Sequence, residues 1–176
     1  MRKLKLDELN RISIEEFKEQ AKIPLIVLLE NIRSLNNVGT IFRTCDAFKV
    51  EAIYLIGITG KPPHREIQKA ALGATESVDW KYFSKTEEAI FELKKKGYFI
   101  GSIEQVEGST DISDLSSKVF QKLAIVFGNE VKGVEQSTID MSNICIEVPQ
   151  YGTKHSLNVA VCAGVVIWEG FKILSI

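Results

Sequence analysis

The chain has 176 residues, of which 45% are hydrophobic and 26% charged, and its formal net charge is −1. This composition fits one globular domain with a full core, and no apolar run reaches the roughly 18 residues of a membrane span. The near-neutral charge argues against a dedicated nucleic-acid-binding protein, which usually has a clear basic excess. The N-terminal segment mixes charges with single apolar residues, so it is not expected to be a signal peptide.

Residues 1–22 predict a short helical arm that ends before Pro24, and residues 23–176 predict the folded domain. Leu25–Glu30 is an almost continuous apolar run, typical of a strand covered on both faces. Further strands are expected at 52–57, 78–83, 98–103, 122–127 and 144–148, and helices after Asn37 and at 64–72, 84–96, 134–141 and 156–173. Asn37, Ser84 and Ser156 are the expected helix caps. Strands that alternate with helices predict an α/β fold with a mostly parallel sheet and helices on both faces.

The last predicted helix, Ser156–Ile173, is apolar on nearly all sides, with residues such as Val161, Val165 and Trp168. A helix of this kind must be covered on most sides. We therefore expect a dimer interface, with a central core helix of a monomer as the alternative.

The cysteines Cys45, Cys145 and Cys162 are odd in number, widely spaced and set among apolar residues. They are expected to be reduced, buried side chains of a cytoplasmic protein. His64 and His155 form no metal-ligand spacing with them, so no metal site is predicted.

Two apolar runs, Leu123–Phe127 and Ile144–Val148, each end in a polar loop. Open α/β sheets bind ligands at the carboxyl ends of their strands, so these loops predict a binding site late in the chain. In the first loop Gly128 and Gly133 flank Glu130, which could also be a solvated acid in a turn. In the second, Ser156 could cap the closing helix, and Asn158 in its first turn offers both a donor and an acceptor.

A third candidate segment, Asn31–Ala47, has Arg43 on the side of a helix away from its apolar stripe. The planar fork of an arginine suits a phosphate or a carboxylate. Pairing of Arg43 with Asp46 or another surface acid is an equal alternative. The sequence has no dinucleotide fingerprint after the first strand, no P-loop, no nucleophile elbow and no zinc spacing.

Together and in this order, the three segments resemble the SpoU/TrmH family of the SPOUT methyltransferase superfamily. The matching residues of its three motifs are Asn37, Gly39, Arg43 and Thr44; Gly128, Glu130 and Gly133; and Val148, Pro149, Gly152, Ser156, Leu157, Asn158 and Val159. The resemblance covers roughly residues 25–170.

The resemblance implies a C-terminal trefoil knot, a homodimer and methylation of a ribose 2′-hydroxyl in tRNA or rRNA. It implies that S-adenosylmethionine is bound by Ile103, Gly128, Val148, Ser156 and Leu157. The implied catalytic residues are Arg43, Asn37, Glu130, Ser156 and Asn158. Because a guanidinium is not ordinarily deprotonated in proteins, two roles for Arg43 stay open: a base assisted by an RNA phosphate, or a phosphate clamp.

Two other functions stay open for this sequence: an inactive RNA-binding module of the same fold, and a knotted methyltransferase that acts on a base. Residues 1–22 are too few for a separate RNA-binding domain. RNA is therefore expected to bind to basic side chains on the dimer surface, and the candidates are Arg2, Lys3, Lys5, Lys61, Arg65 and Lys69.

Overall fold

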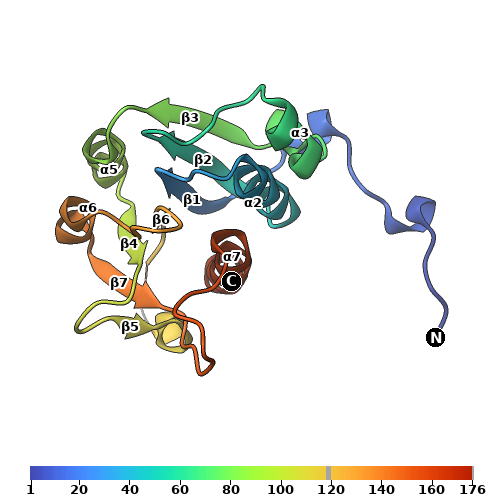
Figure 1. Cartoon of the computed structure of the whole chain (residues 1–176). Helices are drawn as coiled ribbons and strands as arrows, with labels where there is room; N and C mark the ends of the chain where they lie inside the picture. The colour runs from blue at the N-terminus through green and yellow to red at the C-terminus, as the bar shows by residue number, and fades with distance from the viewer. Residues whose placement is uncertain (118–119, 176) are drawn as a thin grey trace.

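The computed structural model describes residues 1–117 and 120–175 and shows a sheet with helices packed against both of its faces (Figure 1). The strands are β1 (Ile23–Glu30), β2 (Val50–Ile56), β3 (Asp79–Phe83), β4 (Phe99–Ile103), β5 (Thr110–Asp111), β6 (Leu123–Phe127) and β7 (Ile144–Glu147). The α-helices are α1 (Ile14–Glu19), α2 (Leu35–Ala47), α3 (Arg65–Ala71), α4 (Ala74–Ser77), α5 (Thr86–Lys95), α6 (Gln136–Met141) and α7 (Val159–Leu174). Short 3-10 helices cover Leu6–Leu9 and Ile112–Ser117.

The strands are arranged in the order β3-β2-β1-β6-β4-β7-β5, and every pairing between them is parallel. Side chains of β1 alternate between the two faces of the sheet, as strand geometry requires. Leu25, Val27 and Leu29 belong to the core shared with α2 and α7, whereas Ile26 and Leu28 belong to the core shared with α5. The predicted α/β class with helices on both faces is confirmed, and the knot stays a prediction.

Two of the expected helix starts are wrong by two or three residues. The first long helix begins at Leu35, and the Ser34 hydroxyl, rather than Asn37, is its cap and accepts the Asn37 backbone N–H at 3.3 Å. The last begins at Val159 with Asn158 as its cap, so Ser156 lies in the preceding loop. Asn37 instead lies in the first turn of α2, where its side chain contacts the distant residues Glu130 and Asn158.

The predicted capping box at Ser84 is also wrong. Helix α5 begins at Thr86 after Lys85, and the Ser84 hydroxyl donates instead to the Glu88 carboxylate at 3.3 Å. The short elements α4 and β5 were not predicted from the sequence. Each has four residues or fewer, too few for a recognisable hydrophobic period.

The N-terminal segment extends away from the rest of the chain (Figure 1). Its helix α1 is capped by Ser13, which forms a reciprocal capping box with Glu16. Phe17 is buried in the core and anchors this end of the chain. The division into an arm and a domain stays a prediction. Among residues 1–117 and 120–175, none of the helices combines the length and apolar character of a membrane span.

Helix α7 has one buried face and one exposed apolar face. Ala163, Val166 and Ile167 are fully buried against the sheet and α2. On the other side, Leu157 (before the helix start), Val161, Val165 and Trp168 are 39–56% exposed and recur at helical spacing. This row of four residues, here called the α7 stripe, is an apolar surface that the chain itself leaves uncovered.

Candidate functional site

A cavity of about 620 Å³ lies at the carboxyl edge of the sheet, between the loops that follow β4, β6 and β7. Because parallel strands place their carboxyl ends at one edge, loops distant in sequence meet there. All of the predicted cofactor-binding residues line this main cavity: Ile103, Gly128, Val148, Ser156 and Leu157. Their role stays a prediction.

The loop after β6 is closed by its own backbone and by one asparagine. Asn129 and Gly133 exchange backbone hydrogen bonds of 3.0 and 2.9 Å. The Asn129 side-chain oxygen accepts the N–H groups of Val131 and Lys132 at 2.9 and 3.0 Å. Gly128 packs so closely on this turn that an added Cβ would lie 2.2 Å from the Gly133 carbonyl carbon. The turn therefore requires glycine at position 128.

Glu104 forms a wall of the main cavity and was not predicted as a site residue. Its carboxylate accepts the Val134 N–H at 2.9 Å and packs against Gly133, whose φ of +71° favours glycine. Glu104 follows β4 directly, and an acid immediately after a buried strand is the signal that could have indicated it. Its carboxylate fixes the far end of the loop that carries Glu130.

Glu130 is the point at which the second motif contacts the first. Its carboxylate accepts the backbone N–H groups of Arg33 and Ser34 at 2.9 and 3.0 Å, and the Asn37 amide at 3.1 Å. Burial by itself would raise the pKa of Glu130, but these backbone and side-chain donors together hold the pKa below its ordinary value. Glu130 is exposed in a turn, as the alternative interpretation expected, but its carboxylate is held by three donors and is not free in solvent.

Asn37 also contacts the third motif. Its side-chain oxygen accepts the Asn158 amide at 3.2 Å. The Asn158 oxygen in turn accepts the N–H groups of Ala160 and Val161 at the start of α7, at 2.9 and 3.3 Å. Glu130, Asn37 and Asn158 therefore form one chain of hydrogen bonds, here called the polar relay, along the edge of the main cavity.

A buried acid at the end of β1, Glu30, connects elements at the same edge of the sheet. Its carboxylate is fully buried and accepts the hydroxyls of Thr86 and Thr138, each at 2.5 Å, and the Glu135 backbone N–H at 2.9 Å. The next residue, Asn31, donates to the Glu135 carboxylate at 2.9 Å. These bonds tie the end of β1 to α5 and α6, and so place the loop between β6 and α6.

Arg43 lies outside the main cavity of its own chain. Six residues separate it from Asn37 on α2, about 9 Å along the helix axis and about 120° around it. Its side chain is exposed, and it forms no ion pair with any residue in 1–117 or 120–175. The alternative pairing with Asp46 or another acid is therefore wrong for these residues, and Asp46 instead accepts the Ser77 hydroxyl.

The cysteines differ in their surroundings. Cys45 is fully buried in the core, and burial raises the pKa of its thiol. Cys162 lines the main cavity, and burial raises its pKa to about 11. Within the described part of the chain no cluster of His, Cys, Asp and Glu could hold a metal ion.

The profile of the SpoU rRNA methylase family matches residues 24–168. The chain belongs to this family. A protein of Staphylococcus haemolyticus assigned to the TrmH family of tRNA/rRNA methyltransferases is 28% identical over 159 residues, which cover 90% of this chain and 63% of that relative. The chain thus spans less than two thirds of the length of the curated relatives it matches.

Solved structures of the family have the same fold. The TrmH/SpoU tRNA modifying enzyme of A. aeolicus superposes with a TM-score of 0.79 at 26% identity, over 91% of this chain and 80% of that one. An AdoMet-bound rRNA methyltransferase from Sinorhizobium meliloti superposes with a TM-score of 0.77 at 26% identity, over 93% and 62% of the two chains. The fold predicted from the motifs is confirmed by these likenesses.

Proposed function

We propose that this protein transfers a methyl group from S-adenosylmethionine to a ribose 2′-hydroxyl of tRNA or rRNA. The observation that supports it most is the polar relay, because it joins the three family motifs at the edge of one cavity. Asn37 is 93 positions from Glu130 and 121 positions from Asn158 along the chain, yet it is hydrogen-bonded to both. Family membership supports RNA methylation, and the S. meliloti relative is bound to AdoMet.

The main cavity fits the proposed cofactor. Small-molecule sites usually occupy about 300–1,000 Å³, and this cavity has about 620 Å³. Ile103, Val148 and Leu157 offer apolar walls, and Gly128 contributes to the lining directly after β6. Bound S-adenosylmethionine would supply a methyl group activated by a sulfonium.

The protein residues must then orient the ribose and accept its proton. The exposed Ser156 hydroxyl lies in the cavity wall and can hydrogen-bond a ribose oxygen. Asn158 and Asn37 are held in one orientation by the relay. In this proposal Arg43 has one of two roles: it accepts the 2′-proton as a base assisted by an RNA phosphate, or it clamps that phosphate through its fork while the phosphate or a water accepts the proton.

We further propose that the active unit is a homodimer. The α7 stripe is the uncovered apolar surface that a second copy would bury. Arg43 lies outside the cavity of its own chain. If a second copy packs on α2 and α7, the Arg43 side chain of one copy could reach the cavity of the other. The proposal therefore assigns each active site to two chains.

In this proposal the protein is cytoplasmic, and RNA is held by basic side chains on its surface. The six candidates, Arg2, Lys3, Lys5, Lys61, Arg65 and Lys69, are all exposed. Lys61 lies 3.9 Å from the centre of the Tyr82 ring, so an aromatic face stands beside one of them. If these charges bind phosphates, raising salt from about 50 to 200 mM will weaken RNA binding steeply; a flat response would remove them from the proposal.

The test is transfer of tritium from labelled S-adenosylmethionine to unmodified tRNA and rRNA. We expect the wild-type protein to label one of them. Arg43→Lys keeps the charge but loses the fork, so we expect it to lose most of its turnover. Wild-type protein that binds RNA without transferring label would instead be an RNA-binding module. Near wild-type turnover of Arg43→Lys would exclude both proposed roles of Arg43.

A further inference from the structure

A smaller hollow of about 380 Å³ adjoins the main cavity. It is lined by Arg33, Ser34, Asn37 and Glu130, and Glu130 also lines the main cavity. The two spaces therefore share the carboxylate of the polar relay. A polymer substrate that places one nucleotide against the main cavity can therefore lay its neighbouring backbone over this hollow.

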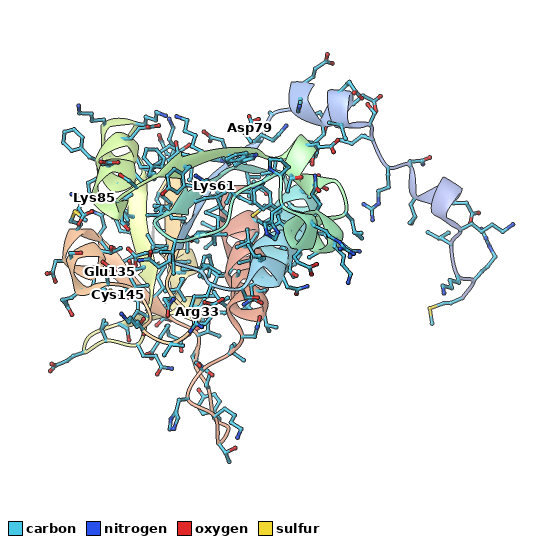
Figure 2. The ribbon with its side chains drawn as sticks, turned by 45° about the horizontal axis from the view of Figure 1, so that its top comes forward. Arg33, Lys61, Asp79, Lys85, Glu135 and Cys145 are labelled. Carbon is cyan, nitrogen blue, oxygen red and sulfur yellow. The ribbon has the colours of Figure 1, made fainter. Side chains whose placement is uncertain are left out.

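Arg33 has a fixed backbone and a free side chain. Its N–H donates to the Glu130 carboxylate at 2.9 Å, which holds the Cα at the edge of the hollow. Its guanidinium is exposed and makes neither a hydrogen bond nor an ion pair with the residues of 1–117 and 120–175. Arg33 lies on the side of the molecule from which the loop between β7 and α7 projects (Figure 2).

Four other surface cations of the described chain have acidic partners. Arg2 pairs with Glu8, Lys81 and Lys96 pair with Glu92, and Lys172 pairs with Glu169. Arg33 has a carboxylate next to its own backbone, yet its guanidinium does not turn to it. The backbone donors of Arg33 and Ser34 already occupy the Glu130 oxygens, so the fork of Arg33 stays available to an external anion.

The charges that line the hollow favour one orientation of a bound nucleotide. Glu130 repels an anion at the inner end, where a ribose hydroxyl could donate to the carboxylate instead. Arg33 is the only cation among the four lining residues, and its planar fork matches two phosphate oxygens.

We propose that Arg33 binds the backbone phosphate next to the methylated ribose, with the neighbouring sugar turned toward Glu130. This inference rests on the proposed function and adds to it a substrate-binding residue. Arg33 acts on RNA and has no part in holding the cofactor, because the main cavity is lined without it.

The test compares Arg33→Gln and Arg33→Lys with the wild-type protein and with Lys95→Gln. Lys95 is a matched control, an exposed cation on α5 that lies over the Phe91 ring and lines neither cavity. The measured quantities are the Kd for total tRNA as a function of salt, the KM for RNA and the Kd for S-adenosylhomocysteine.

We expect Arg33→Gln to weaken RNA binding about tenfold, in line with a hydrogen bond to a charged group. The slope of log K against log salt should fall by about 0.7–0.9, the value of one phosphate contact. S-adenosylhomocysteine affinity and the circular dichroism spectrum should not change, Arg33→Lys should be intermediate, and Lys95→Gln should match the wild type. An unchanged salt slope in Arg33→Gln would overturn the inference.

A second arm uses an RNA fragment that the wild-type protein labels, with one neutral methylphosphonate next to the methylated nucleotide. The neutral linkage should weaken binding to the wild type but cause little further loss in Arg33→Gln, because both changes remove one contact. Equal losses in the two proteins would exclude this phosphate as the partner. Absence of any labelled RNA would refute the proposed function instead, so the two failures are distinguishable.

Discussion

Replacement of Asn37 by aspartate tests the polar relay most sharply, because it changes one amide into a second carboxylate. The Asn37 amide nitrogen lies 3.1 Å from a Glu130 oxygen, and Asn37 is only 9% exposed. Two charges at that distance repel by about 5 kcal/mol at an effective dielectric constant of about 20.

Proton uptake limits the cost of this repulsion. Keeping one carboxyl protonated at pH 7, against an ordinary pKa of about 3.9, costs about 4 kcal/mol, and at pH 5 about 1.5 kcal/mol. The protonated acid can still donate to Glu130, which keeps the hydrogen bond. We therefore expect Asn37→Asp to lower the free energy of unfolding by about 3–4 kcal/mol at pH 7 and by about 1.5 kcal/mol at pH 5.

The direction in which stability changes with pH follows from the number of protons that the folded and unfolded states bind. In Asn37→Asp the folded protein holds a proton that the unfolded chain releases, so stability is lost as pH rises. In the wild type the lowered pKa of Glu130 acts in the opposite sense, and its contribution is lost as pH falls through the acid range.

Urea unfolding at pH 5 and pH 7 measures both effects. The matched control is Asn36→Asp, the same chemical change one residue earlier at an exposed position of α2. It should alter stability by less than about 0.5 kcal/mol at either pH. Equal effects of the two variants, or a loss in Asn37→Asp that does not grow with pH, would refute the contact between Asn37 and Glu130.

Three more results are expected. Gly128→Ala should cost about 1–3 kcal/mol of unfolding free energy, since its Cβ would overlap backbone at 2.2 Å, whereas Gly152→Ala, with nothing within 4 Å, should be nearly neutral; equal effects would contradict the tight turn. Val165→Glu on the α7 stripe should give a monomer by light scattering. Phe91→Glu, which also replaces an exposed apolar side chain by an acid but on α5, should leave a dimer, and a monomeric wild type would refute the dimer. S-adenosylhomocysteine should slow alkylation of Cys162, which lines the main cavity, and an unchanged rate would place the ligand elsewhere.

The sheet could be predicted from the sequence because its strands are locally distinctive. Leu25–Glu30 and Leu123–Phe127 are continuous apolar runs, and both are buried on both faces. The short β5 and α4 have no such local signal, since their place depends on neighbouring strands and helices. Hydrophobic pattern thus predicts the buried strands well and the short edge elements poorly.

The candidate site was only partly predictable, because its contacts join distant residues. Sequence alone could not decide whether Glu130 is solvated, since its donors at Arg33 and Ser34 lie 97 and 96 positions away. The same holds for Asn37, whose side chain binds two distant partners instead of capping its own helix. Arg33 was missed because a lone charged residue in a loop has no spacing to recognise, whereas the position of Glu104 directly after β4 was a usable signal.

Alkaline hydrolysis of tritium-labelled RNA tests the proposed ribose chemistry most directly. A methyl group on a 2′-oxygen removes the nucleophile that alkali needs to break the next phosphodiester bond. We expect the label from the wild-type reaction to appear in an alkali-resistant dinucleotide. Label found in mononucleotides would mean that a base is methylated, and would contradict the assignment of this cavity to ribose methylation.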